Sequence, residues 1–405
     1  MNQVPFGFTP GDDGNQPFDL NSLGDMLSQL GAAMKRSGVD GGEAVSWSTI
    51  RDVARQAIAA ESDPSIVEAQ RTAVENAVSL AQTWLDPNTS FPASSLKAHA
   101  WSRSEWVENT LAAWQPVINP IAEGMTNTVT SLSADAAESL PEEMKSMLGP
   151  MMNMAKQMSA VTTSMQMGNG LAALSADLLA GGEIGLPLSA DNIPAVFPNH
   201  VTTFAAENEL PAADVLMFVA AREAAVQRLF AANPWLKADL IDLVAGYARG
   251  LTFDRERISE AMGSIDPSRP ESMQEIMASG VFTPAATPEQ QRQLERLEFR
   301  VALIEGWVAA VVAASLDSRL GSVAALSETM NRRRASGGPA ERAFANLVGL
   351  ELRPRLMRQA TAFWQSVAEL VGSAARDEMW RHPDFLPSVD DLEDPAGFVK
   401  NTSAE

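Results

Sequence analysis

Residues 212–232 read AADVLMFVAAREAAVQRLFAA, a stretch without glycine or proline in which apolar side chains recur at helical spacing. The recurring apolar positions are Val215, Phe218, Val219, Val226, Leu229 and Phe230. Arg222 lies in the middle of this face, four residues from both Phe218 and Val226. Because arginine is almost never fully buried without a partner, the stretch predicts a core helix that carries one charge in need of a counter-ion.

A second long stretch, residues 288–316, repeats this pattern with the opposite charge. Its apolar stripe consists of Leu294, Leu297, Val301, Ile304, Val308, Val311 and Val312. Glu305 lies within the stripe, where an ionised carboxylate must either become neutral or find a cation. We therefore predict that Arg222 and Glu305 face each other. The alternative is that each charged tip reaches water from the edge of its stripe.

The remaining composition favours a mostly α fold. The chain has a single tyrosine and few alternating Val, Ile and Thr runs, so strand signals are scarce. Amphipathic helices are expected at 19–36, 45–60 and 64–84, with Ser62-Asp63-Pro64 capping the third. The tryptophans that follow, Trp84, Trp101, Trp106 and Trp114, are expected in the core rather than at a ligand site.

Changes in amino-acid composition along the chain suggest five parts. These are a flexible leader (1–18), an N-terminal helical portion (19–135), a Met-rich helical section (136–188), a helical core (189–385) and an irregular acidic tail (386–405). The Met-rich section holds eight methionines: Met144, Met147, Met151, Met152, Met154, Met158, Met165 and Met167. Gly149-Pro150 and Gly168-Asn-Gly are expected to interrupt it. Flexible thioether side chains suit either a packed helix pair or an adaptable docking groove.

Net charge and cysteine content limit the function. With 30 Lys and Arg against 51 Asp and Glu, the chain of 405 residues carries a formal charge of −21 and repels phosphate backbones. Nucleic acid is therefore not expected as a partner. The absence of cysteine excludes thiolate metal sites and disulfides. No export signal is recognised, and the run Val301 to Leu316 is too short to span a membrane and contains Glu305, so a cytoplasmic location is expected.

Five blocks of the sequence carry a family resemblance. They are VAAREAAVQRLF (219–230), LIEGWV (303–308), RRRASGGPA (332–340), LVGLELRPR (347–355) and WRHPDFLP (380–387). In these blocks and their order the chain resembles an actinobacterial family of zincin-like, zinc-dependent metallopeptidases. The resemblance implies a helical zincin-like fold with additional N-terminal helices.

The zinc-binding members of that family carry HExxH, two histidine ligands four residues apart with a glutamate that activates water. The matching window here reads Arg222-Glu223-Ala224-Ala225-Val226. Only the glutamate is retained, and neither a guanidinium nor an isopropyl group binds Zn²⁺. The resemblance also places a third, carboxylate ligand at Glu305, which is present. Glu223 would then be a vestigial general base, and the guanidinium of Arg222 would replace the metal cation beside Glu305.

Two functions follow from this reading. The first is a family member that has lost zinc and catalysis, holds no cofactor and serves as a cytoplasmic binding or scaffold protein for an unidentified protein or peptide. The alternative is an active hydrolase that uses Glu223 without metal, or with a metal held by carboxylates and His200. Glu351, Arg353 and His200 are candidates for the same cleft, although an ion pair that holds a helix kink is the favoured explanation for the first two.

The histidines and a run of three arginines are the remaining candidates for a chemical role. The histidines, His99, His200 and His382, lie in different segments, and no Gly-x-Ser-x-Gly elbow or phosphate-binding loop accompanies them. The run Arg332-Arg333-Arg334 either grips an anion or, as is more common, caps a helix C-terminus and pairs with the acidic surface.

Overall fold

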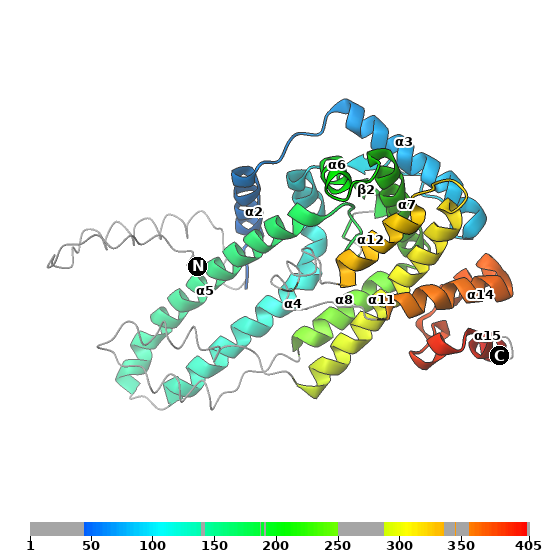
Figure 1. Cartoon of the computed structure of the whole chain (residues 1–405). Coiled ribbons are helices and arrows are strands. Elements are labelled where there is room, and N and C mark those ends of the chain that lie inside the picture. Colours follow the sequence, from blue (N-terminus) through cyan, green and yellow to red (C-terminus); the bar gives the residue numbers. More distant parts are fainter. Residues whose placement is uncertain are drawn as a thin grey trace.

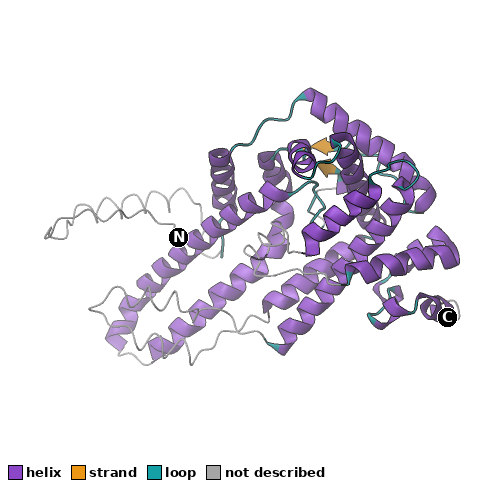
Figure 2. Cartoon of the chain, viewed as in Figure 1, coloured by secondary structure: helices purple, strands orange, loops and turns teal. Residues whose placement is uncertain are grey.

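The computed structural model describes residues 44–138, 142–186, 188–189, 192–249, 287–335, 345 and 356–402. Helices make up most of this part of the chain (Figure 2), so the predicted mostly α class is confirmed. The expected leader and the helix at 19–36 lie outside the described residues, as do Glu351 and Arg353.

The helices follow one another in chain order (Figure 1). They are α2 (Trp47–Glu61), α3 (Glu68–Leu85), α4 (Arg103–Glu138), α5 (Glu142–Asp177), α6 (Pro198–Glu207), α7 (Ala212–Ala232), α8 (Pro234–Arg249), α11 (Pro288–Leu316), α12 (Val323–Ala335), α14 (Met357–Glu378) and α15 (Pro395–Thr402). Short 3-10 turns span Asp86–Asn88, Met379–Arg381, Pro383–Phe385 and Asp390–Glu393. Two short parallel strands, β1 (His99–Ala100) and β2 (Ala195–Val196), pair His99 with Ala195 and Ala100 with Val196.

Helices α7 and α11 form the centre, with the bounds that their apolar patterns predict. α7 contacts α3, α6 and α11, while α11 also packs on α8 and α14 (Figure 1). By length and composition α11 could cross a membrane, but 72% of its apolar window is buried inside the protein. That burial is the pattern of a core helix. The buried apolar side chains of the described residues form one continuous core.

The eight methionines of the Met-rich section lie on one long helix, α5, which lies beside α4 (Figure 1). The expected interruptions at Gly149-Pro150 and Gly168-Asn-Gly are wrong, because the helix continues through both. Gly168 serves close packing instead: a Cβ there would lie 2.8 Å from the Ile50 carbonyl oxygen of α2. Of the eight methionine side chains, two are described: Met167 is buried and Met165 is half exposed.

The expected cap of the third helix is also wrong. α3 begins at Glu68 rather than residue 64, and Val67 is its N-cap residue. Asp63 caps a different helix, since its carboxylate accepts hydrogen bonds from the backbone N–H groups of Arg103 (3.0 Å) and Ser104 (2.9 Å) at the start of α4. A side chain that reaches an orphan N–H of a distant helix satisfies the same need as a local cap. Sequence spacing alone does not distinguish the two.

The predicted acidic tail is more ordered than expected. Residues 386–402 form a 3-10 turn and α15, which packs on α14. Phe398 is buried there against Phe363, with the ring centroids 5.3 Å apart. The tryptophan prediction holds for Trp101, Trp106 and Trp114, which are buried, whereas Trp84 is partly buried.

The crossing of α11 and α14 gives a prediction about stability. A Cβ at Gly306 would lie 2.6 Å from the Ala360 Cβ and 2.8 Å from the Thr361 nitrogen. We expect Gly306→Ala to lower the free energy of unfolding by about 1–3 kcal/mol, because the backbone of α14 must shift. Gly321→Ala is the matched control, since no atom of the described residues lies within 4 Å of its added Cβ. Equal urea midpoints for the two variants would contradict this close approach.

Candidate functional site

Arg222 on α7 and Glu305 on α11 face each other, as predicted. Arg222 Nη2 donates to Glu305 Oε2 across 2.5 Å. The side chains are 13% and 2% exposed, respectively. The alternative, in which each tip reaches water from the helix edge, is therefore wrong. The two oppositely charged residues are brought together because each lies on the apolar stripe that packs against the other helix.

Arg334 is a second cation on the same carboxylate, which sequence reasoning missed. It lies in the last turn of α12, and its guanidinium also contacts Glu305 Oε2. Its side chain is 10% exposed. One buried carboxylate oxygen thus receives two guanidinium groups from two different helices. The sequence pattern favours a helix cap on the acidic surface for the run of three arginines, but the position of α12 in the fold turns Arg333 and Arg334 inward.

Glu223, next to Arg222, is held by a separate set of donors. Its carboxylate accepts hydrogen bonds from the backbone N–H of Gly182 (3.0 Å), the backbone N–H of Ala195 (3.1 Å) and Gln227 Nε2 (2.9 Å). The residue is almost completely buried. Burial raises the pKa of Glu223 to about 7, and the three hydrogen bonds oppose that rise.

A tight turn at Gly181-Gly182 makes this arrangement possible. A Cβ at Gly182 would lie 2.9 Å from Val226 Cγ1 and 3.0 Å from Glu223 Oε2. Only a residue without a side chain lets the backbone N–H approach the carboxylate so closely. The same turn is fastened to α12, because Arg333 pairs with Glu183 and Arg334 Nη2 donates to the Glu183 carbonyl across 2.9 Å.

These side chains surround a small cavity of about 20 Å³. It is lined by Leu179, Ala180, Gly182, Glu183, Val219, Arg222, Glu223, Val226, Glu305, Met330 and Arg334. The volume suits about one water molecule. All four residues predicted for this site, Arg222, Glu223, Val226 and Glu305, therefore line one space. Among the described residues, no group of three or more His, Cys, Asp and Glu is arranged to hold a metal ion.

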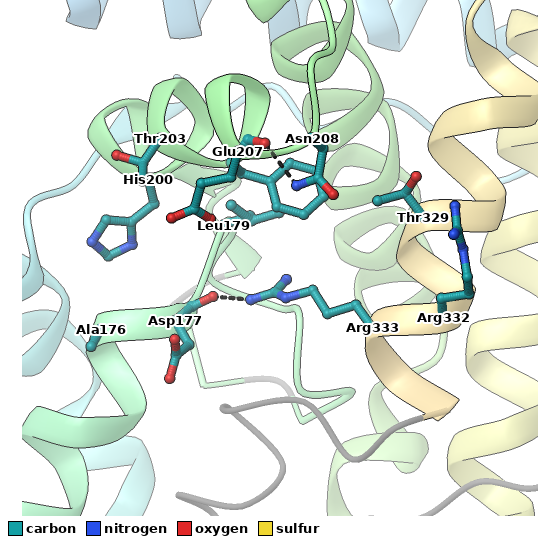
Figure 3. Close-up of a pocket in the computed structure, with 11 residues that line it drawn as sticks. Ala176, Asp177, Leu179, His200, Thr203, Glu207, Asn208, Thr329, Arg332 and Arg333 are labelled. Atoms are coloured by element: carbon teal, nitrogen blue, oxygen red, sulfur yellow. Dashed lines mark hydrogen bonds between the residues drawn. The ribbon is translucent and has the colours of Figure 1, made fainter.

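His200 lies on a different and larger hollow. A groove of about 880 Å³ runs between the end of α5, α6 and α12 (Figure 3). His200 Nδ1 donates to the Leu178 carbonyl across 2.7 Å, and the ring stacks on Phe197. Burial lowers the pKa of His200. His200 does not line the small cavity, so the structure does not place it with Glu223 and Glu305.

Arg333 lines the groove, its neighbour Arg334 lines the small cavity, and Leu179 lines both. Figure 3 shows its side chain extending from α12 toward Asp177, whose backbone carbonyl it contacts. Arg333 also lies over the ring of Phe204, 5.8 Å from its centroid. Arg332, the next residue back along α12, is exposed and pairs with Glu328. The basic run thus divides between one surface residue and two residues engaged in the interior.

Two further buried charged residues have structural roles that the sequence pattern did not reveal. Arg228 on α7 donates to the Gln82 side chain (2.6 Å) and pairs with Asp86 (2.7 Å). Asp377 at the end of α14 accepts from Trp307 Nε1 (2.9 Å) and Thr89 Oγ1 (2.6 Å). Each is satisfied by several partners. His382 is likewise structural, since its ring accepts from the Asp384 backbone N–H.

The shared carboxylate yields a prediction for a double-mutant cycle. Arg222→Met or Arg334→Met alone leaves Glu305 one cation, so each should cost about 1–2 kcal/mol of unfolding free energy. The double variant leaves a buried carboxylate without a cation and should cost about 3–5 kcal/mol or more. Urea unfolding measures all three.

The control for this cycle is the carboxylate itself. Adding Glu305→Gln to the double variant should restore part of the lost stability, since a neutral amide needs no cation. Strictly additive single effects with no recovery from Glu305→Gln would show that the charges act independently.

The raised pKa of Glu223 predicts a pH dependence. Between pH 4.5 and 7 the folded chain holds a proton that the unfolded chain releases. The contribution of Glu223 to stability is therefore present below pH 4.5 and is lost as pH rises toward 7, by at most about 3 kcal/mol. Glu223→Gln should remove this component, measured as the difference in unfolding free energy at pH 5 and pH 7.5. The exposed Glu209→Gln is the control and should keep the wild-type slope; the same slope in both variants would argue against the assignment.

Comparisons with known proteins bear on this site. Residues 45–399 match the family model described as zincin-like metallopeptidase. A solved structure described as "a putative hydrolase with a novel fold from Chloroflexus aurantiacus" is similar, with a TM-score of 0.59 and 18% sequence identity. The match covers 89% of this chain and 99% of that one, and at this identity it shows a likeness of fold. A comparison with curated proteins gives no match.

Proposed function

The chain belongs to the zincin-like metallopeptidase family, and we propose that within this family it has lost zinc and peptidase chemistry and acts as a binding or scaffold protein. The supporting observation is the buried Glu305 carboxylate, which is bound by Arg222 and Arg334. A carboxylate whose Oε2 is bound by two guanidinium groups is not available as a metal ligand.

The side chains around the cavity do not fit a zinc ion. Catalytic zinc sites use three protein ligands with nitrogen, sulfur or oxygen donors. Arg222 and Val226 occupy the two positions where HExxH has histidines, and neither supplies a donor atom. A dication placed here would also lie beside Arg222 and Arg334 and be repelled by both.

The alternative, an active hydrolase that uses Glu223, finds less support. A general base must reach the water or substrate from which it takes a proton. Glu223 is enclosed by three donors, and the adjoining cavity of about 20 Å³ has no room for a peptide bond. His200, which would be needed for an unconventional metal site, lines the neighbouring groove instead.

A binding role is supported by the groove that His200 lines. The groove of about 880 Å³ offers polar side chains from three helices together with the apolar Leu179 and Phe204. Such mixed surfaces suit a polypeptide segment. The net charge of −21 argues against nucleic acid as a partner. We propose that the protein acts in the cytoplasm.

Metal analysis tests the proposal directly. Protein purified without chelators should contain far less than one zinc per chain, because Arg222 and Val226 cannot coordinate it. One tightly held equivalent of zinc in the unmodified protein would overturn the proposal. Hydrolysis of a mixed peptide library by the same sample would favour the alternative.

A reconstruction tests the mapping of the site. Arg222→His with Val226→His and Arg334→Gln should create zinc affinity, since it supplies two imidazoles and frees Glu305. Adding Glu305→Gln to this variant is the control and should weaken zinc binding at least tenfold, measured by competition with a chromogenic chelator. A folded reconstruction without zinc affinity would show that these positions do not share one coordination geometry.

A further inference from the structure

A second cavity, distinct from the small one, lies between α7, α11, α12 and α14. Its volume is about 260 Å³. Its lining residues are Phe218, Arg222, Ala309, Val312, Ala313, Ser327, Met330, Asn331, Arg358, Thr361, Ala362 and Gln365. Arg222 and Met330 belong to both cavities, so these two side chains separate the larger cavity from the space beside Glu223 and Glu305.

The charge of this lining is unusual for the protein. Among the described residues that line the cavity are two arginines, Arg222 and Arg358, and no carboxylate. The chain as a whole carries 21 more acidic than basic residues. The groove of Figure 3, by contrast, combines Arg332 and Arg333 with Asp177 and Glu207. A cationic lining on an acidic protein selects for an anion.

Arg222 has donors left for such an anion. Its Nη2 is bound to Glu305, while Nε and Nη1 have no hydrogen-bond partner among the residues that the structure describes. The carboxylate oxygen that Arg222 contacts is also bound by Arg334, so Glu305 is not a partner of Arg222 alone. Arg358 adds a second, exposed guanidinium, whose ion pair with Glu328 is long at 3.9 Å.

The other walls are apolar or neutral. Phe218, Val312 and Met330 are buried side chains that present hydrophobic surface. Ser327, Asn331, Thr361 and Gln365 supply uncharged polar groups. The cavity of about 260 Å³ is more than ten times as large as the neighbouring cavity of about 20 Å³.

We propose that this cavity binds a small carboxylate with a short apolar chain. The carboxylate pairs with Arg222 and Arg358, and the chain lies against Phe218, Val312 and Met330. Guanidinium groups match carboxylates in geometry and charge. The same chemistry is presented by a free aliphatic acid and by the C-terminal residue of a polypeptide.

Calorimetric titration with hexanoate tests the site. Hexanoate has a carboxylate and a chain of suitable size, and it should bind saturably with one site per chain. Hexanamide, which has the same shape without the charge, should bind at least tenfold more weakly. The titrations are made in metal-free buffer, so their outcome does not depend on whether the neighbouring site has lost zinc.

A pair of adjacent alanines on α11 provides matched variants. Ala313 lines the cavity and is partly exposed, whereas its neighbour Ala314 is exposed and is not part of the lining. Ala313→Leu fills the space and should weaken hexanoate binding at least tenfold, while Ala314→Leu should leave it unchanged. Arg358→Gln, a change of an exposed side chain, should weaken hexanoate and spare hexanamide.

Two peptide probes distinguish the source of the carboxylate. Acetyl-Gly-Ala-Leu with a free C-terminus should bind more tightly than hexanoate if the site receives a chain terminus, and more weakly if it receives a free acid. Its C-terminal amide should bind at least tenfold more weakly than the free form in either case. Absence of saturable binding by both acids, equal binding of the neutral analogues, or equal loss in the two leucine variants would overturn the proposal.

Discussion

The structure depends on one buried carboxylate that is shared by two cations. Glu305 is surrounded by apolar side chains of α11, and an isolated charge there would cost several kcal/mol. Arg222 from α7 and Arg334 from α12 remove that cost and, in doing so, fix the positions of three helices relative to one another. Because the two guanidinium groups are themselves nearly buried, they in turn need the Glu305 carboxylate as a counter-charge.

Further contacts connect α7 and α12 to the turn at Gly181-Gly182. Glu223 binds the backbone of that turn and of β2, while Arg333 and Arg334 bind Glu183 within it. The helix that has the family's glutamate is thereby attached to a loop, a strand and a further helix. The space around Glu223 and Glu305 is thus filled with ion pairs and hydrogen bonds, and it retains room for about one water molecule.

Much of the central fold was predictable, because it follows from the local spacing of apolar residues along the chain. The bounds of α7 and α11, their apolar faces and the contact between Arg222 and Glu305 all follow from the 3.6-residue repeat and the cost of burying a charge. Arg334 was not predictable in this way, since a basic residue in a last helical turn has the same local signature on a surface as in a core. Asp63 shows the same limit: its type indicates a cap, but the helix that it caps lies 40 residues away. Arg228 and Asp377 escaped notice because their partners come from distant segments that no spacing rule connects.

The cations at the centre of this protein are covalent parts of its chain. In proteins built around a structural or catalytic metal, folding and metal binding are thermodynamically coupled, so chelators and metal scarcity loosen the native state. Here the positive charges between α7, α11 and α12 are the guanidinium groups of Arg222 and Arg334, which are side chains of the polypeptide itself. These ion pairs therefore join the three helices through groups that cannot dissociate from the chain.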